Sequence, residues 1–181
     1  RAKLYTLGFP NKEIQDGFTD FLLPLYTNFS EEKIALAMYK FKDALARNDI
    51  STFMKIFDAS VSPEFWSPTS SKEKRDEKLN NMYAYQVAFH AMLRMTGFDV
   101  VSEQQVIGGR VDVTLETSDT AYIFELKMDD GKPWKEVART ALAQIEKKGY
   151  ATRFDASKKK IYKMGLVFST EKGGVAGYLV E

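Results

Sequence analysis

Two carboxylates and a lysine lie close together in a stretch of alternating apolar and polar residues. Asp112 falls within Gly109–Leu115, and Glu125 and Lys127 fall within Tyr122–Lys127. Both segments alternate with the period of a half-buried β-strand. The residues between them, Thr117–Thr120, are typical of a turn, so the two segments predict a β-hairpin. The other face of this hairpin would be a hydrophobic slab made of Val111, Val113, Leu115, Tyr122, Phe124, Leu126 and Met128.

The expected pairing of the two strands brings like charges together. If the turn is centred on residues 118–119, Asp112 lies opposite Glu125 and Arg110 lies opposite Lys127. Facing carboxylates destabilise a sheet and raise the pKa of one of the pair. A divalent cation between them would remove this conflict, because Mg²⁺ is bound by carboxylate oxygens. Lys127 would point to the same side, where it could orient a water molecule or stabilise a developing negative charge. The alternative is a solvated hairpin face with two ion pairs that contribute little to stability.

The composition is that of a globular protein with no thiol chemistry. The chain has 181 residues, of which 44% are hydrophobic and 28% are charged, enough for one ordinary domain and an appendage. The absence of cysteine excludes disulfides and thiolate metal sites and agrees with a cytoplasmic setting. A single histidine, His90, excludes His-rich metal sites and argues against a Ser-His-Asp triad. No apolar run approaches the roughly 20 residues of a membrane span, and no secretory signal is present. Because the chain starts at Arg1 without methionine, we expect a fragment of a longer protein.

Positive charge is concentrated after the hairpin. Residues 127–163 contain 11 Lys and Arg against 5 Asp and Glu, whereas the chain as a whole has a net charge of +1. This local excess could attract a polyanion. The alternative is that Lys147, Lys148 and residues 158–160 occupy ordinary solvated positions of a helix and a turn.

The periodicity of the chain predicts three parts. Residues 1–60 form a small helical subdomain, with helices near residues 14–25, 34–45 and 50–57. Residues 61–79, which contain Pro63, Pro68 and a run of charged residues, form a linker. Residues 80–181 form an α/β domain. Its predicted elements are a helix at 80–96, a strand at 98–107, the hairpin, a helix at 134–148 and strands at 161–169 and 175–180.

This order of elements, αβββαβ, resembles the core of the PD-(D/E)XK nuclease superfamily, a restriction-endonuclease-like α/β fold with a mixed central sheet. Gly109–Asp112, Tyr122–Lys127 and Ala143–Tyr150 are similar to motifs of the nuclease-like domain at the C-terminus of bacterial AAA-ATPase-like proteins. Tyr85-Gln86 also matches that group. The N-terminal Tyr5–Asn11 resembles the join between the ATPase module and this domain.

The resemblance implies metal-dependent hydrolysis of phosphodiester bonds in nucleic acid. Asp112 and Glu125 would hold Mg²⁺ or Mn²⁺, with the carbonyl of Leu126 as a third ligand. The expected role of Lys127 is to position the attacking water or stabilise the transition state, and that of Gln144 is to orient the water or the substrate.

Substrate contacts would come from Gln86, Arg110, Lys148 and Tyr150, and the basic residues 127–163 would bind the nucleic-acid backbone. The expected partners are DNA or RNA and an ATPase module of the same full-length protein. Gln86 stands where many members of the superfamily have a glutamate, and Val111 stands where a proline is common. The first change removes a negative charge from the metal site. The alternative function is therefore a catalytically degenerate nuclease fold that acts as a nucleic-acid-binding or protein-interaction module.

Overall fold

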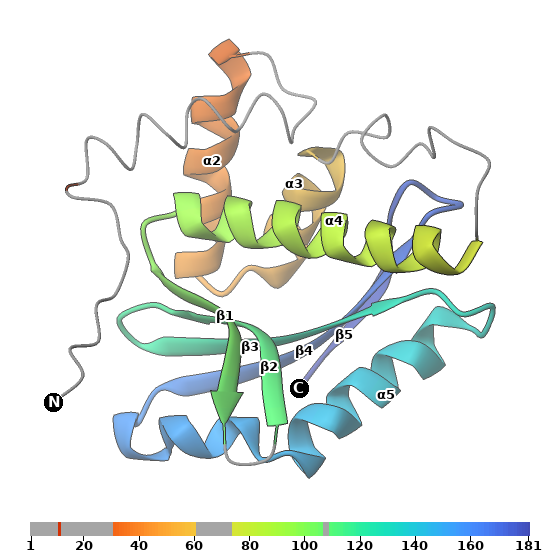
Figure 1. The fold of residues 1–181 in the computed structure, drawn as a ribbon. Helices are drawn as coiled ribbons and strands as arrows, with labels where there is room; N and C mark the ends of the chain where they lie inside the picture. Colours follow the sequence, from red (N-terminus) through yellow and green to blue (C-terminus); the bar gives the residue numbers. More distant parts are fainter. Residues whose placement is uncertain (1–10, 12–30, 61–73, 107–108) are drawn as a thin grey trace, which may run out of the picture.

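A mixed five-stranded sheet forms the centre of the molecule (Figure 1). The computed structural model describes residues 11, 31–60, 74–106 and 109–181. The strands are β1 Asp99–Val106, β2 Gly109–Glu116, β3 Thr120–Met128, β4 Lys160–Ser169 and β5 Gly174–Val180. They lie in sequence order; β3 and β4 are parallel, and the other neighbours are antiparallel. The predicted α/β class with a mixed sheet is confirmed, and the predicted helices and strands from residue 80 onward occur in the structure with one additional 3₁₀-helix before β4.

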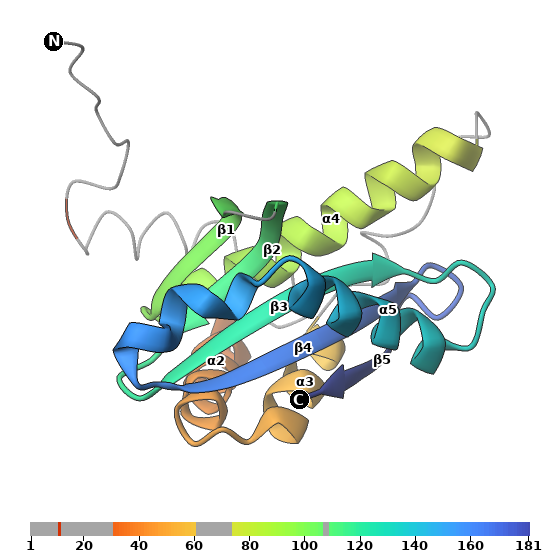
Figure 2. The same ribbon diagram turned by 90° about the horizontal axis from the view of Figure 1, so that it is seen from below.

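Helices cover both faces of this sheet (Figures 1 and 2). One face carries α2 Glu31–Ala46, α3 Ile50–Ser60 and α4 Lys74–Met95. The other face carries α5 Trp134–Lys147 and the 3₁₀-helix η2 Tyr150–Ser157. The connection through α5 and η2 is what allows β4 to run parallel to β3, because a parallel pair needs a long crossover. The first predicted helix, near residues 14–25, lies outside the described residues.

The hairpin has the predicted register. Thr114 pairs with Ile123 and Val113 with Phe124. The pairing between β2 and β3 ends at Val113–Phe124, so the predicted pair of Asp112 and Glu125 lies just beyond the regular ladder.

One residue of the predicted slab packs on the opposite side. Val111 belongs to a cluster with Ile123, Leu142 and Ile145 beneath α5, whereas the sequence predicted it on the same face as Val113. The physical reason is that the part of β2 before Val113 is not paired with β3, so its side chains do not follow the face assigned by simple alternation.

Aromatic side chains fill the core on the α4 side of the sheet. The ring of Phe53 from α3 makes edge contacts with Tyr122 and Phe124 of β3. Tyr85 of α4 stacks on Phe168 of β4 with ring centroids 4.6 Å apart. Helices α2 and α3 contribute to the same buried cluster as α4 and the sheet, so they support the hairpin on the face opposite α5.

Helix α4 begins earlier than predicted. It starts at Lys74 instead of Asn80, so the end of the predicted linker at 61–79 is helical. The reason is that residues 74–79 are mostly strong helix formers and include neither glycine nor proline. The rest of that linker, residues 61–73, lies outside the described residues.

The 3₁₀-helix η2 was not predicted. Gly149 has a left-handed φ of 63° and ends α5. Tyr150 and Phe154, four residues apart, are then both buried in the cluster with Ile145. This apolar spacing was the signal in the sequence, but it is too short to distinguish a 3₁₀ turn from a loop.

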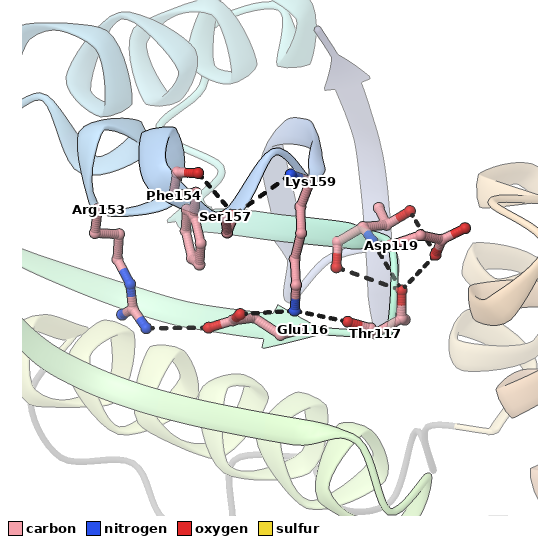
Figure 3. A network of polar contacts seen from close by, with 8 residues as sticks. Glu116, Thr117, Asp119, Arg153, Phe154, Ser157 and Lys159 are labelled. Carbon is pink, nitrogen blue, oxygen red and sulfur yellow. Dashed lines mark hydrogen bonds and ion pairs between the residues drawn. The ribbon is translucent and has the colours of Figure 1, made fainter.

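Polar contacts attach η2 to the hairpin turn (Figure 3). The carboxylate of Glu116 accepts hydrogen bonds from Arg153 at 3.3 Å and from Lys159 at 2.9 Å. Lys159 also donates to the carbonyl of Thr117 at 2.7 Å. Two of the basic residues that follow the hairpin are therefore engaged in holding the fold together.

Among the described helices, none has the length and apolar character that crossing a membrane requires.

Candidate active site

The carboxylate of Asp112 occupies the place where β2 separates from β3. The antiparallel ladder alternates between hydrogen-bonded and non-bonded pairs. Thr117 and Thr120 form a bonded pair, so every second pair from there is bonded, and Val111–Leu126 would be one of them. Instead, the N–H of Leu126 donates to Oδ2 of Asp112 at 2.8 Å. The same alternation directs the carbonyl of Leu126 into this gap, beside the Asp112 carboxylate.

Glu125 lies next to this gap and is almost fully buried, with 1% of its surface exposed. Its Oε1 accepts a hydrogen bond from Lys127 Nζ at 2.7 Å and another from the side-chain amide of Gln144. Its Oε2 has no partner, and within the described residues it is the one buried side-chain N or O atom in that condition. An unpartnered buried carboxylate oxygen is costly, because water no longer solvates it.

Burial, together with the nearby charge of Asp112, raises the pKa of Glu125. Burial is the largest cause and the nearby charge of Asp112 is the second, while Lys127 and Lys148 act in the opposite direction. The two carboxylates are therefore close enough to repel one another, as the predicted register required. A cation bound between them would lower the free energy of the ionised pair.

Helix α5 brings a second group of predicted residues to the same place. Gln144 accepts a hydrogen bond from Lys127 Nζ at 2.9 Å. Lys148, at the C-cap of α5, has a raised pKa because its ammonium bonds the side chain of Tyr150 and faces Glu125 and Asp112. Tyr150 is fully buried, and its hydrogen bond with Lys148 connects it to this group.

Gln86, one of the predicted substrate-binding residues, belongs to a helix that covers the other face of the sheet. Gln86 is half-buried on α4, on the other side of the sheet from α5 (Figure 1). Its side chain makes no hydrogen bond with the predicted site residues that the structure describes. Arg110 lies on β2, where its backbone pairs with Gln105 of β1.

The arrangement fits a hard divalent cation. It offers the carboxylates of Asp112 and Glu125, and the alternation of the ladder directs the carbonyl of Leu126 towards the same gap. The described residues contain no group of three or more His, Asp or Glu side chains suited to a metal ion. Mg²⁺ does not need such a group, since it keeps several waters and is often held by one or two carboxylates and a substrate phosphate. The unpartnered Oε2 of Glu125 is the atom that such an ion would satisfy.

One contributor to the site was not recognised from the sequence. Gly165 of β4 pairs with Glu125 in the parallel ladder. A Cβ atom at this position would lie 2.4 Å from the carbonyl oxygen of Ala138 and 3.0 Å from Cβ of Ala141, both on α5. Gly165 therefore lets α5 approach the sheet beside Glu125. The small residues on α5 were visible in the sequence, but their partner on β4 was not.

Comparison with known proteins assigns the chain to a superfamily. A family model for the PD-(D/E)XK nuclease superfamily matches residues 81–176, and the chain belongs to this superfamily. The chain is also 28% identical over 181 residues to an uncharacterized protein from the vnfD 5′ region of Azotobacter chroococcum mcd 1. That alignment covers 98% of this chain and 33% of the relative, so the chain spans about a third of the relative's length. No solved structure matches the chain.

Proposed function

We propose that the chain is a nuclease domain that hydrolyses phosphodiester bonds of nucleic acid with the help of Mg²⁺ or Mn²⁺. The observation that carries this proposal is the juxtaposition of Asp112, Glu125 and Lys127, with Oε2 of Glu125 buried and unpartnered. An ion pair on a solvated hairpin face would leave both carboxylate oxygens in water. Here one oxygen of Glu125 is held by two donors, and the other is kept out of solvent with nothing to bind.

Asp112, Glu125 and the carbonyl of Leu126 would hold the ion. When bound, the ion would lower the pKa of a coordinated water and neutralise charge on the phosphate. The hydrogen bond from the N–H of Leu126 fixes the Asp112 carboxylate at the edge of the gap.

Lys127 and Lys148 would supply positive charge to the reacting phosphate. An ammonium group has three N–H donors. Lys127 uses two of them, on Glu125 and Gln144, and the third can hold the attacking water or a phosphate oxygen. Its side chain is 29% exposed, so a substrate can reach it. Lys148 is held towards the same carboxylates by its contact with Tyr150.

The nucleic-acid backbone would bind to the exposed basic residues around α5, η2 and the start of β4. Five of them are exposed and form no ion pair with another residue that the structure describes: Lys135, Arg139, Lys147, Lys158 and Lys160. Contacts of this kind position a backbone without reading its sequence. They predict binding that weakens steeply with salt.

We also propose that the domain works within a longer AAA-ATPase-like protein, with residues 1–60 as the helical connection and residues 80–181 as the nuclease-like domain. The motifs of the hairpin and of α5 support this context. The alignment to one third of a longer relative is compatible with it. Purification of the full-length protein and measurement of nucleic-acid-stimulated ATP hydrolysis would test it.

A cleavage assay tests the main proposal. The purified chain is incubated with single- and double-stranded DNA and RNA in Mg²⁺, in Mn²⁺ and in EDTA. Wild type should cut in the presence of metal only, and Asp112→Asn and Lys127→Met should reduce cutting at least 100-fold. Lys55→Met is the matched control, since Lys55 is exposed on α3, on the other face of the sheet. Equal activity of Lys127→Met and Lys55→Met would refute the assignment.

The same assay distinguishes the degenerate-fold alternative. What favours it is that the described residues offer two carboxylates to a metal, with Gln86 where the superfamily resemblance implies a glutamate. A chain that binds nucleic acid in a salt-dependent manner, but neither binds Mn²⁺ nor cuts, would be such a module.

A further inference from the structure

The side chain of Gln144 closes a triangle of hydrogen bonds with two other site residues. Its amide nitrogen donates to Oε1 of Glu125, and its amide oxygen accepts from Nζ of Lys127 at 2.9 Å. Nζ of Lys127 in turn donates to the same Oε1 of Glu125 at 2.7 Å. One amide from α5 thus contacts both residues of the Glu-X-Lys motif on β3.

The chemistry of the three groups allows only one orientation of this amide. The carboxylate of Glu125 accepts hydrogen bonds and the ammonium of Lys127 donates them. A rotated amide would place oxygen against carboxylate oxygen and N–H against ammonium, and both contacts would be repulsive. The triangle therefore specifies the rotamer of all three side chains at once.

We propose that Gln144 is a positioning residue that decides which oxygen of Glu125 faces the metal site. By holding Oε1, it leaves Oε2 as the oxygen available to a cation. By accepting from Lys127, it keeps the ammonium on the Oε1 side and away from Oε2. Without Gln144, Lys127 could pair with either oxygen and compete with the cation for Glu125. The inference rests on the proposed function for its link to catalysis, while its link to metal binding can be measured separately.

Two substitutions separate this role from a structural one. Gln144→Leu keeps a side chain of similar length on α5 but removes both hydrogen bonds. Gln144→Glu keeps an acceptor for Lys127 but loses the donor to Glu125. Thr140→Val is the matched control, because Thr140 is exposed one turn earlier on α5 and its hydroxyl bonds only the carbonyl of Glu136 in its own helix.

The primary measurement is calorimetric titration with Mn²⁺ at neutral pH, using protein that circular dichroism shows to be folded. Loss of an outer-shell partner of a metal ligand typically costs 10- to 100-fold in affinity or activity. We expect Gln144→Leu to raise the dissociation constant for Mn²⁺ by about that factor. We expect kcat to fall with it, while KM for an oligonucleotide changes less than kcat. Gln144→Glu should also have a lower kcat than wild type, and Thr140→Val should match wild type in both assays.

The outcomes distinguish this inference from the proposed function. If wild type binds Mn²⁺ and Gln144→Leu binds it within twofold, the positioning role is refuted and the nuclease proposal stands. If Mn²⁺ binds and depends on Gln144 but no nucleic acid is cut, the positioning role stands and hydrolysis is refuted. If wild type binds no Mn²⁺ at all, both are refuted.

Discussion

A single methyl group added at Gly165 should disturb the site from the β4 side. Gly165 pairs with Glu125 and faces α5, where its Cβ would lie 2.4 Å from the carbonyl oxygen of Ala138. Ordinary van der Waals contact for such a Cβ begins at 3.4 Å. The neighbour is helix backbone, which cannot rotate away as a side chain can. We therefore expect Gly165→Ala to push α5 away from the sheet by about 1 Å.

The displacement of α5 should lower both the stability of the fold and its affinity for Mn²⁺. Overpacking of a well-packed core costs about 1–3 kcal/mol. For a chain of this size that corresponds to a melting temperature lower by roughly 2–12 °C. The bond from Lys127 to Gln144 is 2.9 Å long, and adding about 1 Å takes it beyond hydrogen-bonding range. Affinity for Mn²⁺ should then fall about tenfold or more, as for loss of Gln144 itself.

The assay compares Gly165→Ala with Gly177→Ala by thermal melting and Mn²⁺ titration. A Cβ at Gly177 would lie 2.4 Å from the ring of Trp134, at the N-terminal end of α5 and away from Gln144. Gly177→Ala should therefore lower stability while leaving Mn²⁺ affinity near that of wild type. The reasoning fails if Gly165→Ala melts like wild type, or if it melts lower yet binds Mn²⁺ with unchanged affinity.

Three further predictions concern stability. Burial raises the pKa of Glu125, so above that pKa its ionisation disfavours the folded state; Glu125→Gln should melt at or above the wild-type temperature at pH 7. This difference in melting temperature should shrink as pH falls through the raised pKa, and it should vanish below about 4.3, the ordinary pKa of glutamate. Glu125→Gln should also lose the Mn²⁺-dependent shift in melting temperature at every pH. Glu116→Gln should cost about 1 kcal/mol or less, with a smaller effect at high salt and unchanged Mn²⁺ affinity, because it weakens only the tie to η2. Phe53→Ala should cost about 3–5 kcal/mol and shift one cooperative melting transition, since its ring packs on Tyr122 and Phe124; a separate early transition would show instead that the N-terminal helices unfold independently.

The sequence by itself determined the elements and the pairing of the central hairpin. Alternation over residues 109–128 and the turn residues between the strands predicted a register that the structure reproduces at Thr114–Ile123 and Val113–Phe124. The register can be predicted from this short segment, because a one-residue slip would move every apolar side chain to the wrong face. The same register predicts that Asp112, Glu125 and Lys127 lie near one another.

Only the tertiary structure decided how these groups are held. That Oε1 of Glu125 is held by donors and Oε2 is not depends on Gln144, which reaches Glu125 from a separate helix. The approach of α5 depends on the missing side chain of Gly165, whose partner residues on α5 precede it by more than 20 positions. Tyr150 was predicted to contact the substrate from its motif alone, but packing places it in the core behind Lys148. Such contacts join segments far apart in the chain, and no periodicity within one segment encodes the distance between two.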